Sequence, residues 1–360
     1  MGELLTIDGS RGEGGGQILR TSLALAACTG TEIRLANIRA SRPRRGLAAQ
    51  HLTAARAAAE ICGGELSGDE LGSIELTFRP GRPRGGSYHF VVPSAGSACL
   101  VFQTVLWPLL AADEPSSVTF EGGTHNPMAP PFDFLAQSFV PLLERMGASV
   151  LLRLESYGFY PHGGGRFVAR IEPCERLAPL ELLDAGPVVE RRARALLARL
   201  PGHIATRELG VVRDRLGWHE DECLLRRIKT SGGPGNAVLL QIERQHLTET
   251  FTGFGVRGQR AEAVARGAVD QVERYLAAAV PVGPYLADQL VIPLGLAGGG
   301  AFATLPLSAH AETNIEVVAE ILGRRFAVSS FPPHGVLVSL GAGPGTGARP
   351  SRPPPPPSAP

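Results

Sequence analysis

His310 is the side chain in this sequence best suited to act as a nucleophile. It lies in the segment TLPLSAHAETNIEVVAEIL, between an expected strand over 302–307 and an apolar helical pattern. Thr313 and Glu316 fit a T-x-x-E capping box, which predicts a helix start there and leaves His310 on the preceding loop. The positive end of a helix disfavours a charged imidazole, whose free pKa is about 6.5, so we expect a neutral ring at pH 7. A neutral imidazole can attack phosphorus, but a surface-loop histidine would fit the same context.

A basic loop precedes the predicted helix that carries Gln50 and His51. Four arginines fall within seven residues of this loop: Arg39, Arg42, Arg44 and Arg45. Guanidinium groups bind phosphate through charge-assisted hydrogen bonds, so the loop is a candidate phosphate site. The same composition is equally typical of a solvated run of charges.

The stretch GSRGEGGGQILR, residues 9–20, runs from a glycine-rich loop into an apolar segment. Backbone N–H groups and the helix dipole favour an anion at such a junction. The loop lacks the Lys-Ser/Thr ending of the common nucleotide loop, and its glycines are spaced too closely for the dinucleotide fingerprint. We therefore expect one wall of a composite pocket, with Arg20 reaching the same phosphates. Glu13 could hold Mg²⁺, which takes one or two carboxylates plus phosphate oxygens, or it could be an exposed turn acid.

The stretch GPYLADQ, residues 283–289, begins another predicted helix, with Pro284 suited to its first turn. Tyr285, Asp288 and Gln289 are spaced at i, i+3 and i+4, so they share one helix face. An aromatic ring, an acid and an amide on one face suit a nucleoside. The alternative is an ordinary helix start with a surface tyrosine.

The elements that must position these residues recur along the chain. The sequence contains three similar units, at about 1–82, 83–182 and 280–341. In each unit we predict a strand, a helix, a strand, a helix and two short strands. We therefore predict an α/β (α+β) fold, with two helices on each four-stranded sheet. The segment 183–279 lies between the second and third units and is predicted to be a smaller insert domain. The Pro/Gly-rich tail at 342–360 is predicted to be disordered.

The composition is that of a soluble protein with a sizeable core. The 360 residues are 44% hydrophobic and 19% charged, and the formal net charge of +1 means that any polyanion must bind a local patch. The five cysteines form no C-x-x-C pair, and their odd number argues for a reduced, cytoplasmic compartment. No apolar run is long enough to cross a bilayer, so we expect no membrane attachment. Nothing indicates an obligate protein partner.

Several motifs, taken in order, resemble the RNA 3′-terminal phosphate cyclase family. They are GEGGGQILR, IRASRPRRGLAAQHL, GGTHNPMAPPFDF, YLADQL and the single His310, and the resemblance runs from about Ile7 to about Leu340. It implies three repeated units and an insert of thioredoxin-like topology, in which the lone Cys223 would have no redox role. It also implies that ATP adenylylates His310.

The resemblance assigns further roles to residues of this chain. It implies that Tyr285 and Pro130 enclose adenine, and that Mg²⁺ or Mn²⁺ assists. Arg39 and Arg42 match phosphate-contacting arginines, whereas Arg44 and Arg45 match less securely. The residues implied to bind ATP are Gln103, Pro130, Tyr285, Leu286, Ala287, Asp288 and Gln289. Those expected around the phosphates or the RNA end are Arg20, Arg39, Arg42, Gln50 and His51, with Glu13 as the metal ligand. Gln103 could instead be a locally bonded buried amide.

The function implied is ATP-dependent cyclisation of an RNA 3′-phosphate to a 2′,3′-cyclic phosphate. Two alternatives stay open from the sequence. One is a catalytically silent, cyclase-like protein that binds RNA in ribosome assembly, against which His310 and the 285–289 element argue. The other is an enolpyruvyl transferase, which would need neither a nucleophilic histidine nor an adenine site.

Overall fold

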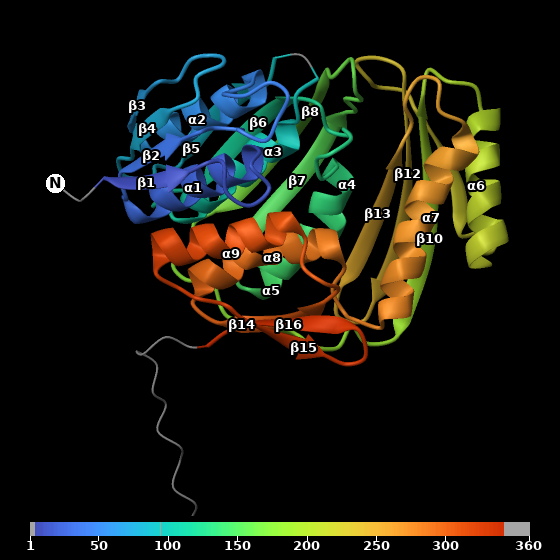
Figure 1. Cartoon of the computed structure of the whole chain (residues 1–360). Helices are drawn as coiled ribbons and strands as arrows, with labels where there is room; N and C mark the ends of the chain where they lie inside the picture. The colour runs from blue at the N-terminus through green and yellow to red at the C-terminus, as the bar shows by residue number, and fades with distance from the viewer. Residues whose placement is uncertain (1–3, 94, 342–360) are drawn as a thin grey trace, which may run out of the picture.

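The computed structural model describes residues 4–93 and 95–341 and contains four four-stranded mixed sheets with their helices (Figure 1). This confirms the predicted mixed α/β class. The tail at 342–360, expected to be disordered, lies outside the described residues. Within the described part, no helix combines the length and the apolarity that crossing a bilayer requires.

The first two sheets are built from consecutive segments of the chain. The first has the order β1-β2-β4-β3, and the second has the order β5-β6-β8-β7. In each sheet the first two strands are parallel and the other neighbours are antiparallel. The elements of the first sheet are β1 (Leu5–Asp8), α1 (Gly16–Thr29), β2 (Ile33–Ala36), α2 (Ala49–Cys62), β3 (Glu65–Ser67) and β4 (Leu76–Arg79). Those of the second are β5 (Gly86–Val91), α3 (Ala98–Leu110), β6 (Ser116–Gly122), α4 (Phe132–Phe134), η1 (Leu135–Phe139), α5 (Val140–Arg145), β7 (Ser149–Ser156) and β8 (Gly165–Glu172).

The third sheet repeats the strand order of the first two sheets, in which the fourth strand lies between the second and the third. Its first strand, however, is far from the other three in the sequence. Its order is β9-β14-β16-β15, and β9 is parallel to β14, with Leu180 opposite Gly300. Its elements are β9 (Leu180–Leu182), α8 (Pro284–Ala297), β14 (Gly300–Thr304), α9 (Ala309–Leu322), β15 (Ala327–Phe331) and β16 (Gly335–Leu340). The edge strand β9 therefore comes from the end of the segment that was expected to form the second unit. Its pairing with β14 is a contact between distant parts of the chain, which local sequence patterns do not reveal.

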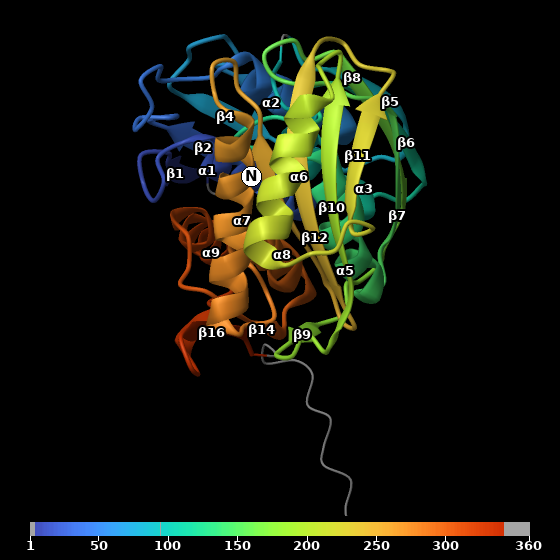
Figure 2. The ribbon, with the colours of Figure 1, turned by 90° about the vertical axis from the view of Figure 1, so that its right-hand side faces the viewer.

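The segment 183–279, which we call the insert, has its own sheet in the order β11-β10-β12-β13. Its elements are β10 (Val188–Ala198), α6 (His203–Leu216), β11 (Cys223–Ile228), β12 (Gly235–Arg244), β13 (Thr248–Phe254) and α7 (Ala261–Ala278). The helices α6 and α7 cover the outer face of this sheet, and the opposite face turns toward the rest of the molecule (Figures 1 and 2). Consecutive residues are buried in the second half of β10, from Ala193 to Ala198, and over most of β12, as in strands that are covered on both faces.

The main core lies where the helices of the three units pack against one another. The helix α1 packs against α2, α3 and α9, and α8 packs against α9. These contacts follow from helices that are apolar over most of their surface, such as the buried segment Ala98–Leu110. A separate apolar cluster fills the space between the insert sheet and its two helices. The N-termini of α1, α8 and α9 belong to the first of these cores, and they carry the residues singled out for chemistry.

Candidate functional site

A cavity of about 780 Å³ opens where the three units and the insert meet. Its volume lies within the range of small-molecule and cofactor sites. Twelve residues for which the sequence suggested a role line it: Glu13, Arg20, Arg39, Arg42, Gln50, His51, Gln103, Pro130, Tyr285, Asp288, Gln289 and His310. The chain therefore brings together positions from residue 13 to residue 310 around one space, although the role of each remains a prediction.

His310 lies in the first turn of α9, and not on the loop before it. The predicted cap was wrong, because Ser308 is the N-cap and its Oγ accepts a 3.0 Å hydrogen bond from the N–H of Ala311. Burial lowers the pKa of His310, and the charges of Arg20 and Arg42 lower it further against an opposing effect of Glu13. The direction of this shift favours the neutral ring that was expected at pH 7, and its largest cause is burial.

Thr313 has another role than capping, since it docks the glycine loop on α9. Its Oγ1 donates to the carbonyl of Ala309 over 2.6 Å and accepts from the N–H of Glu13 over 3.1 Å. A Cβ on Gly12 would lie 2.0 Å from this hydroxyl, and the φ of Gly12 is +57°. Only glycine allows both the left-handed backbone and the close approach. The loop is thus shaped to hold Glu13 beside the helix that carries His310.

A buried amide ties the three helices of the site together. Asn314 accepts a 2.7 Å hydrogen bond from Thr21 of α1, and its amide nitrogen donates over 2.9 Å to the carbonyl of Asp288 in α8. Gln17 of α1 also donates to the Asn314 side-chain oxygen, over 3.2 Å. Because Asn314 is fully buried, these bonds are protected from water and fix α9 relative to both neighbours.

The cationic part of the cavity is formed by Arg20, Arg39, Arg42 and His51. Burial lowers the pKa of Arg20 to about 10, which leaves its guanidinium charged at neutral pH. Arg42 pairs with Glu13, and Arg39 donates to the carbonyl of Gly46 over 2.8 Å. Arg44 and Arg45 are exposed and do not line the cavity. The structure therefore separates the four arginines into two at the cavity and two in solvent.

His51 adds a neutral donor to this cluster. Burial lowers its pKa to about 3, and Arg20, Arg39 and Arg42 contribute to the same shift. The N–H of Ala48 donates to its Nδ1 over 3.3 Å, so the proton of the neutral ring lies on Nε2. A Cβ on Gly16 would lie 2.2 Å from that Nε2, so a residue with a side chain at position 16 would clash with His51. The cluster thus offers guanidinium and imidazole donors to an anion.

The opposite part of the cavity is less charged. Tyr285 is 50% exposed and lines it together with Pro130. Gln103 of α3 donates a hydrogen bond to Gln289 of α8, so both amides are held at the wall. Asp288 accepts from the Ser308 hydroxyl, and burial raises its pKa to about 7. An aromatic ring with fixed amides offers a nucleoside both stacking and polar contacts.

Two residues expected at this wall have their side chains elsewhere. Leu286 and Ala287 are buried in the core and do not line the cavity. They lie between the i and i+3 positions of α8, so the helix turns them away from the face that carries Tyr285 and Asp288. Moreover, the N–H of Ala287 already donates to the carbonyl of Gly283, over 3.0 Å.

The carboxylates that line the cavity are Glu13 and Asp288. Glu13 accepts from the N–H of Gln17 over 3.1 Å and pairs with Arg42. Within the described residues no cluster of three or more His, Cys, Asp or Glu side chains could hold a metal ion by itself. A hard cation here would need oxygen ligands from a bound phosphate, which is how Mg²⁺ is commonly held, and Glu13 is the carboxylate that fits.

Several lining residues were not foreseen from the sequence. They include Ser97, Asn126, Thr250, Thr252, Phe254 and Gln271, of which the last four belong to the insert. Asn126 lies in the motif GGTHNPMAPPFDF and could have been flagged there. The insert residues have no local signal, because a threonine at alternate positions of a strand is typical of any half-exposed sheet.

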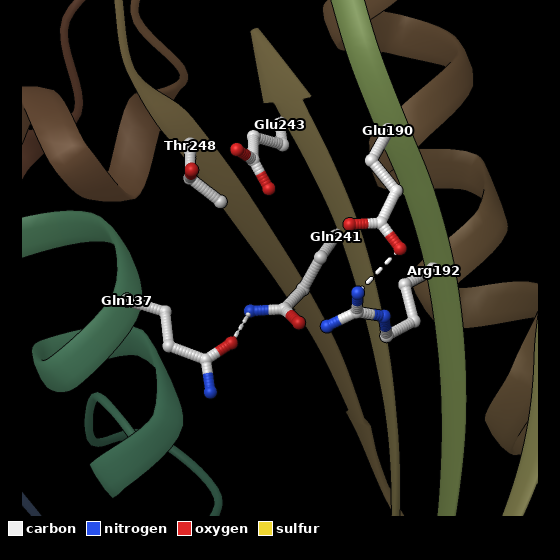
Figure 3. Close-up of a pocket in the computed structure, with 6 residues that line it drawn as sticks. All are labelled: Gln137, Glu190, Arg192, Gln241, Glu243 and Thr248. Carbon is white, nitrogen blue, oxygen red and sulfur yellow. Dashed lines mark hydrogen bonds and ion pairs between the residues drawn. The ribbon is translucent and has the colours of Figure 1, made fainter.

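A second cavity, of about 260 Å³, lies between η1 and the insert sheet (Figure 3). It is lined by Gln137, Glu190, Arg192, Gln241, Glu243 and Thr248, none of which was predicted as a site residue. Its polar groups bond to one another, since Gln241 donates to Gln137 and Arg192 pairs with Glu190 (Figure 3). It contains one arginine and two glutamates, whereas the larger cavity contains three arginines, one glutamate and one aspartate.

Comparison with known proteins gives consistent matches over most of the chain. The family model described as RNA 3′-terminal phosphate cyclase matches residues 11–328. A protein of that name from Koribacter versatilis is 50% identical over 326 residues, covering 91% of this chain and 92% of the relative. Others of the same name are 48% identical in Pseudomonas fluorescens, over 89% of this chain and 93% of the relative, and 47% identical in Salmonella enteritidis, over 91% and 96%.

Among solved structures, the enolpyruvyl transferase NikO from Streptomyces tendae aligns with a TM-score of 0.36 and 11% identity, over 94% of this chain and 48% of that one. This similarity is too low to support an argument about fold or function. The family model, in contrast, extends from the glycine-rich loop to beyond α9, and the relatives cover about nine-tenths of the chain. The chain belongs to the RNA 3′-terminal phosphate cyclase family.

Proposed function

We propose that this protein is an ATP-dependent RNA 3′-terminal phosphate cyclase that works through a covalent His310–AMP intermediate. The names of its relatives support the overall reaction, in which an RNA 3′-phosphate becomes a 2′,3′-cyclic phosphate. The observation that carries the mechanism is the neutral His310 at a cavity that also contains Arg20, Arg42 and His51.

The reaction has three displacements at phosphorus. A nitrogen of His310 attacks the α-phosphorus of ATP, the bond to the β-phosphate oxygen breaks, and pyrophosphate leaves. An oxygen of the RNA 3′-phosphate then attacks the same phosphorus, and the P–N bond breaks with its electron pair returning to the imidazole. Finally the 2′-hydroxyl attacks the terminal phosphorus, gives its proton to solvent, and expels AMP. The covalent intermediates divide one difficult displacement, the direct closure of the cyclic phosphate, into several easier ones.

The charges of the cavity suit the first displacement. Negative charge that develops on the leaving pyrophosphate is stabilised by donors that are fixed beforehand, and Arg20, Arg42 and the Nε2–H of His51 are such donors. Mg²⁺ or Mn²⁺, held by Glu13 and phosphate oxygens, would neutralise part of the triphosphate charge. Tyr285 and Pro130 would hold adenine, with Gln103, Asp288 and Gln289 as polar contacts.

Labelling with α-³²P ATP tests the proposal directly. The protein should acquire a label that is stable in alkali and labile in acid, as a phosphoramidate is, and RNA ending in a 3′-phosphate should discharge it. A strand ending in a 2′-deoxynucleotide 3′-phosphate should accept AMP but be unable to cyclise, so an adenylylated strand should accumulate. A protein that binds RNA but takes no label would instead be a catalytically silent relative. A labelled protein that never adenylylates the deoxy strand it binds would contradict this order of steps.

A further inference from the structure

Two aromatic rings line the large cavity outside the wall that is expected to hold ATP. Tyr160, in the connection between β7 and β8, is 56% exposed, and Phe254 is the half-buried last residue of β13. The residues expected around ATP lie instead on α3, on α8 and in the loop at 126–131. The two rings are therefore candidates for contact with the second substrate of the proposed reaction, the RNA strand.

The connection between β7 and β8 is packed against one end of the insert sheet, and Figures 1 and 2 show both at the upper end of the molecule. The N–H of Gly232 donates to the carbonyl of Tyr157 over 3.2 Å. The ring of Phe159 lies against Gly235, where a Cβ would be 2.0 Å from the Cγ of that ring. Because Tyr160 directly follows Phe159, these contacts hold the exposed ring beside the insert.

Three loops of the insert meet at this end of its sheet. In the register of the sheet, Ala198 is opposite Ile228 on one side and Gly235 on the other. Phe254 is opposite Ala237, two residues along β12. Three loops therefore begin or end here, and they span 199–202, 229–234 and 255–260.

We call these three loops and the β7–β8 connection, residues 157–164, the rim. The rim contains four arginine or lysine residues and no aspartate or glutamate. Three of its cations, Arg199, Lys229 and Arg257, are exposed and form no ion pair with any residue that the structure describes. In a chain whose formal net charge is +1, this is a local surplus of positive charge, and it suits a polyanion.

An exposed ring beside unpaired cations matches the chemistry of a single-stranded nucleic acid. Proteins bind single strands with aromatic side chains on which bases stack and with cations that follow the phosphates. We propose that the rim binds the RNA strand on the 5′ side of its terminal nucleotide, with a base stacked on Tyr160 and backbone phosphates at Lys229 and Arg257. A duplex would offer no unstacked base to the ring, so the strand bound here is unpaired. This inference rests on the proposed function and gives the insert a part in it.

Equilibrium binding of a fluorescent RNA oligonucleotide with a 3′-phosphate, measured by anisotropy at several salt concentrations, tests the rim without requiring turnover. Tyr160→Ala should raise the Kd about tenfold, the effect of losing one base stacked on an aromatic ring. Tyr160→Phe, which keeps the ring, should bind like the unmodified protein. The double variant Lys229→Gln, Arg257→Gln should reduce the slope of log Kd against log salt by about 1.4, as expected for two phosphate contacts on a single strand.

A matched double variant controls for the loss of charge. Arg274→Gln, Arg325→Gln removes two exposed arginines that lie outside the rim and form no ion pair with described residues. It changes the net charge by the same amount as the rim variant and should leave the salt slope unchanged. An equal reduction of the slope in both double variants would show that the RNA responds to net charge alone, and the rim would not be its binding surface.

Self-labelling by ATP distinguishes the rim from the ATP site. The KM for ATP and the melting temperature should be the same in all these variants as in the unmodified protein. A raised KM for ATP in Tyr160→Ala would place the ring in the ATP site and overturn the proposal. Unchanged Kd and unchanged salt dependence for RNA in the folded rim variants would overturn it as well. An unmodified protein that binds the strand through the rim but takes no label from ATP would contradict the proposed function alone.

Discussion

His310 and His125 both lie near arginine and carboxylate groups, yet their surroundings are opposite. His125 is 1% exposed, and its Nε2 contacts Asp133 at 2.8 Å while its Nδ1 contacts Thr124 Oγ1 at 2.9 Å. Its ring stacks on Tyr157, with centroids 4.9 Å apart. His310 is exposed to the cavity and forms no side-chain hydrogen bond with any residue that the structure describes.

The charges around the two histidines differ in the same way. Asp133 is balanced by Arg194, 3.1 Å away on β10, and Arg194 is bonded further to Gln137 and Gln241. Burial opposes ionisation of Asp133, but its bond to His125 and the charge of Arg194 outweigh this and lower its pKa. Around His310, in contrast, Arg20 and Arg42 face Glu13 alone. The saturated histidine thus belongs to a cluster in which Asp133 of the second unit pairs with Arg194 of the insert, whereas His310 has no such partner among the described residues.

The largest expected effect comes from removing the unsaturated histidine. His310→Ala should reduce labelling by α-³²P ATP to background, because the other neutral imidazole of the cavity, His51, has its unprotonated Nδ1 occupied by the N–H of Ala48. Its melting temperature should stay within a degree or two of the unmodified protein, since the side chain has no partner to lose. A variant that is still labelled would show that another residue is the nucleophile.

Breaking the saturated cluster should affect stability instead. Asp133→Ala leaves the buried Arg194 uncompensated, which should cost about 3–5 kcal/mol and lower the melting temperature by roughly 6–20 °C. Asp270→Ala, which removes a half-exposed partner of Arg215, is the matched control and should cost at most about 1 kcal/mol. Equal melting temperatures for the two variants would show that the cluster does not join the insert to the body.

The four arginines of the basic loop allow a similar comparison, between two that line the cavity and two that are exposed to solvent. Arg42→Ala and Arg39→Ala should weaken use of ATP or of the RNA end by about one to two decades, since a charge-assisted hydrogen bond contributes roughly 1.5–3 kcal/mol. Arg44→Ala and Arg45→Ala, in the solvated part of the loop, should change kcat/KM less than about threefold. Similar small effects at all four positions would argue that the cavity arginines do not contact phosphate.

The smallest expected effect is on the pH profile of self-labelling. A lowered pKa keeps His310 neutral at a pH where an ordinary imidazole is protonated, so the acid limb of the rate should lie below pH 6.5. An unshifted imidazole would lose roughly fourfold between pH 8 and pH 6, and His310 should lose less. A limb at or above pH 6.5, measured with saturating ATP, would show that the surroundings do not depress the pKa.

The chemistry of single elements could be predicted because it depends on local spacing. The i, i+3, i+4 pattern placed Tyr285, Asp288 and Gln289 on one face of α8, and all three line the cavity. The same periodicity could have warned that Leu286 and Ala287 point into the core. The cap of α9 was misassigned because Ser308 and Thr313 both satisfy the local rules, and only the contact between Thr313 and the glycine loop decides between them.

The sequence by itself determined the fold class and the motifs that mark the family, since both depend on residue types and on short-range spacing. The lowered pKa of His310, in contrast, comes from burial and from distant charges. Only the tertiary structure decided that β9 completes the third sheet, that Gly12 and Gly16 make room for Thr313 and His51, and that β13 and α7 form a wall of the cavity. These contacts join residues far apart in the chain. Their energies come from burial and pairing between distant segments, which leave no periodic trace in either segment alone.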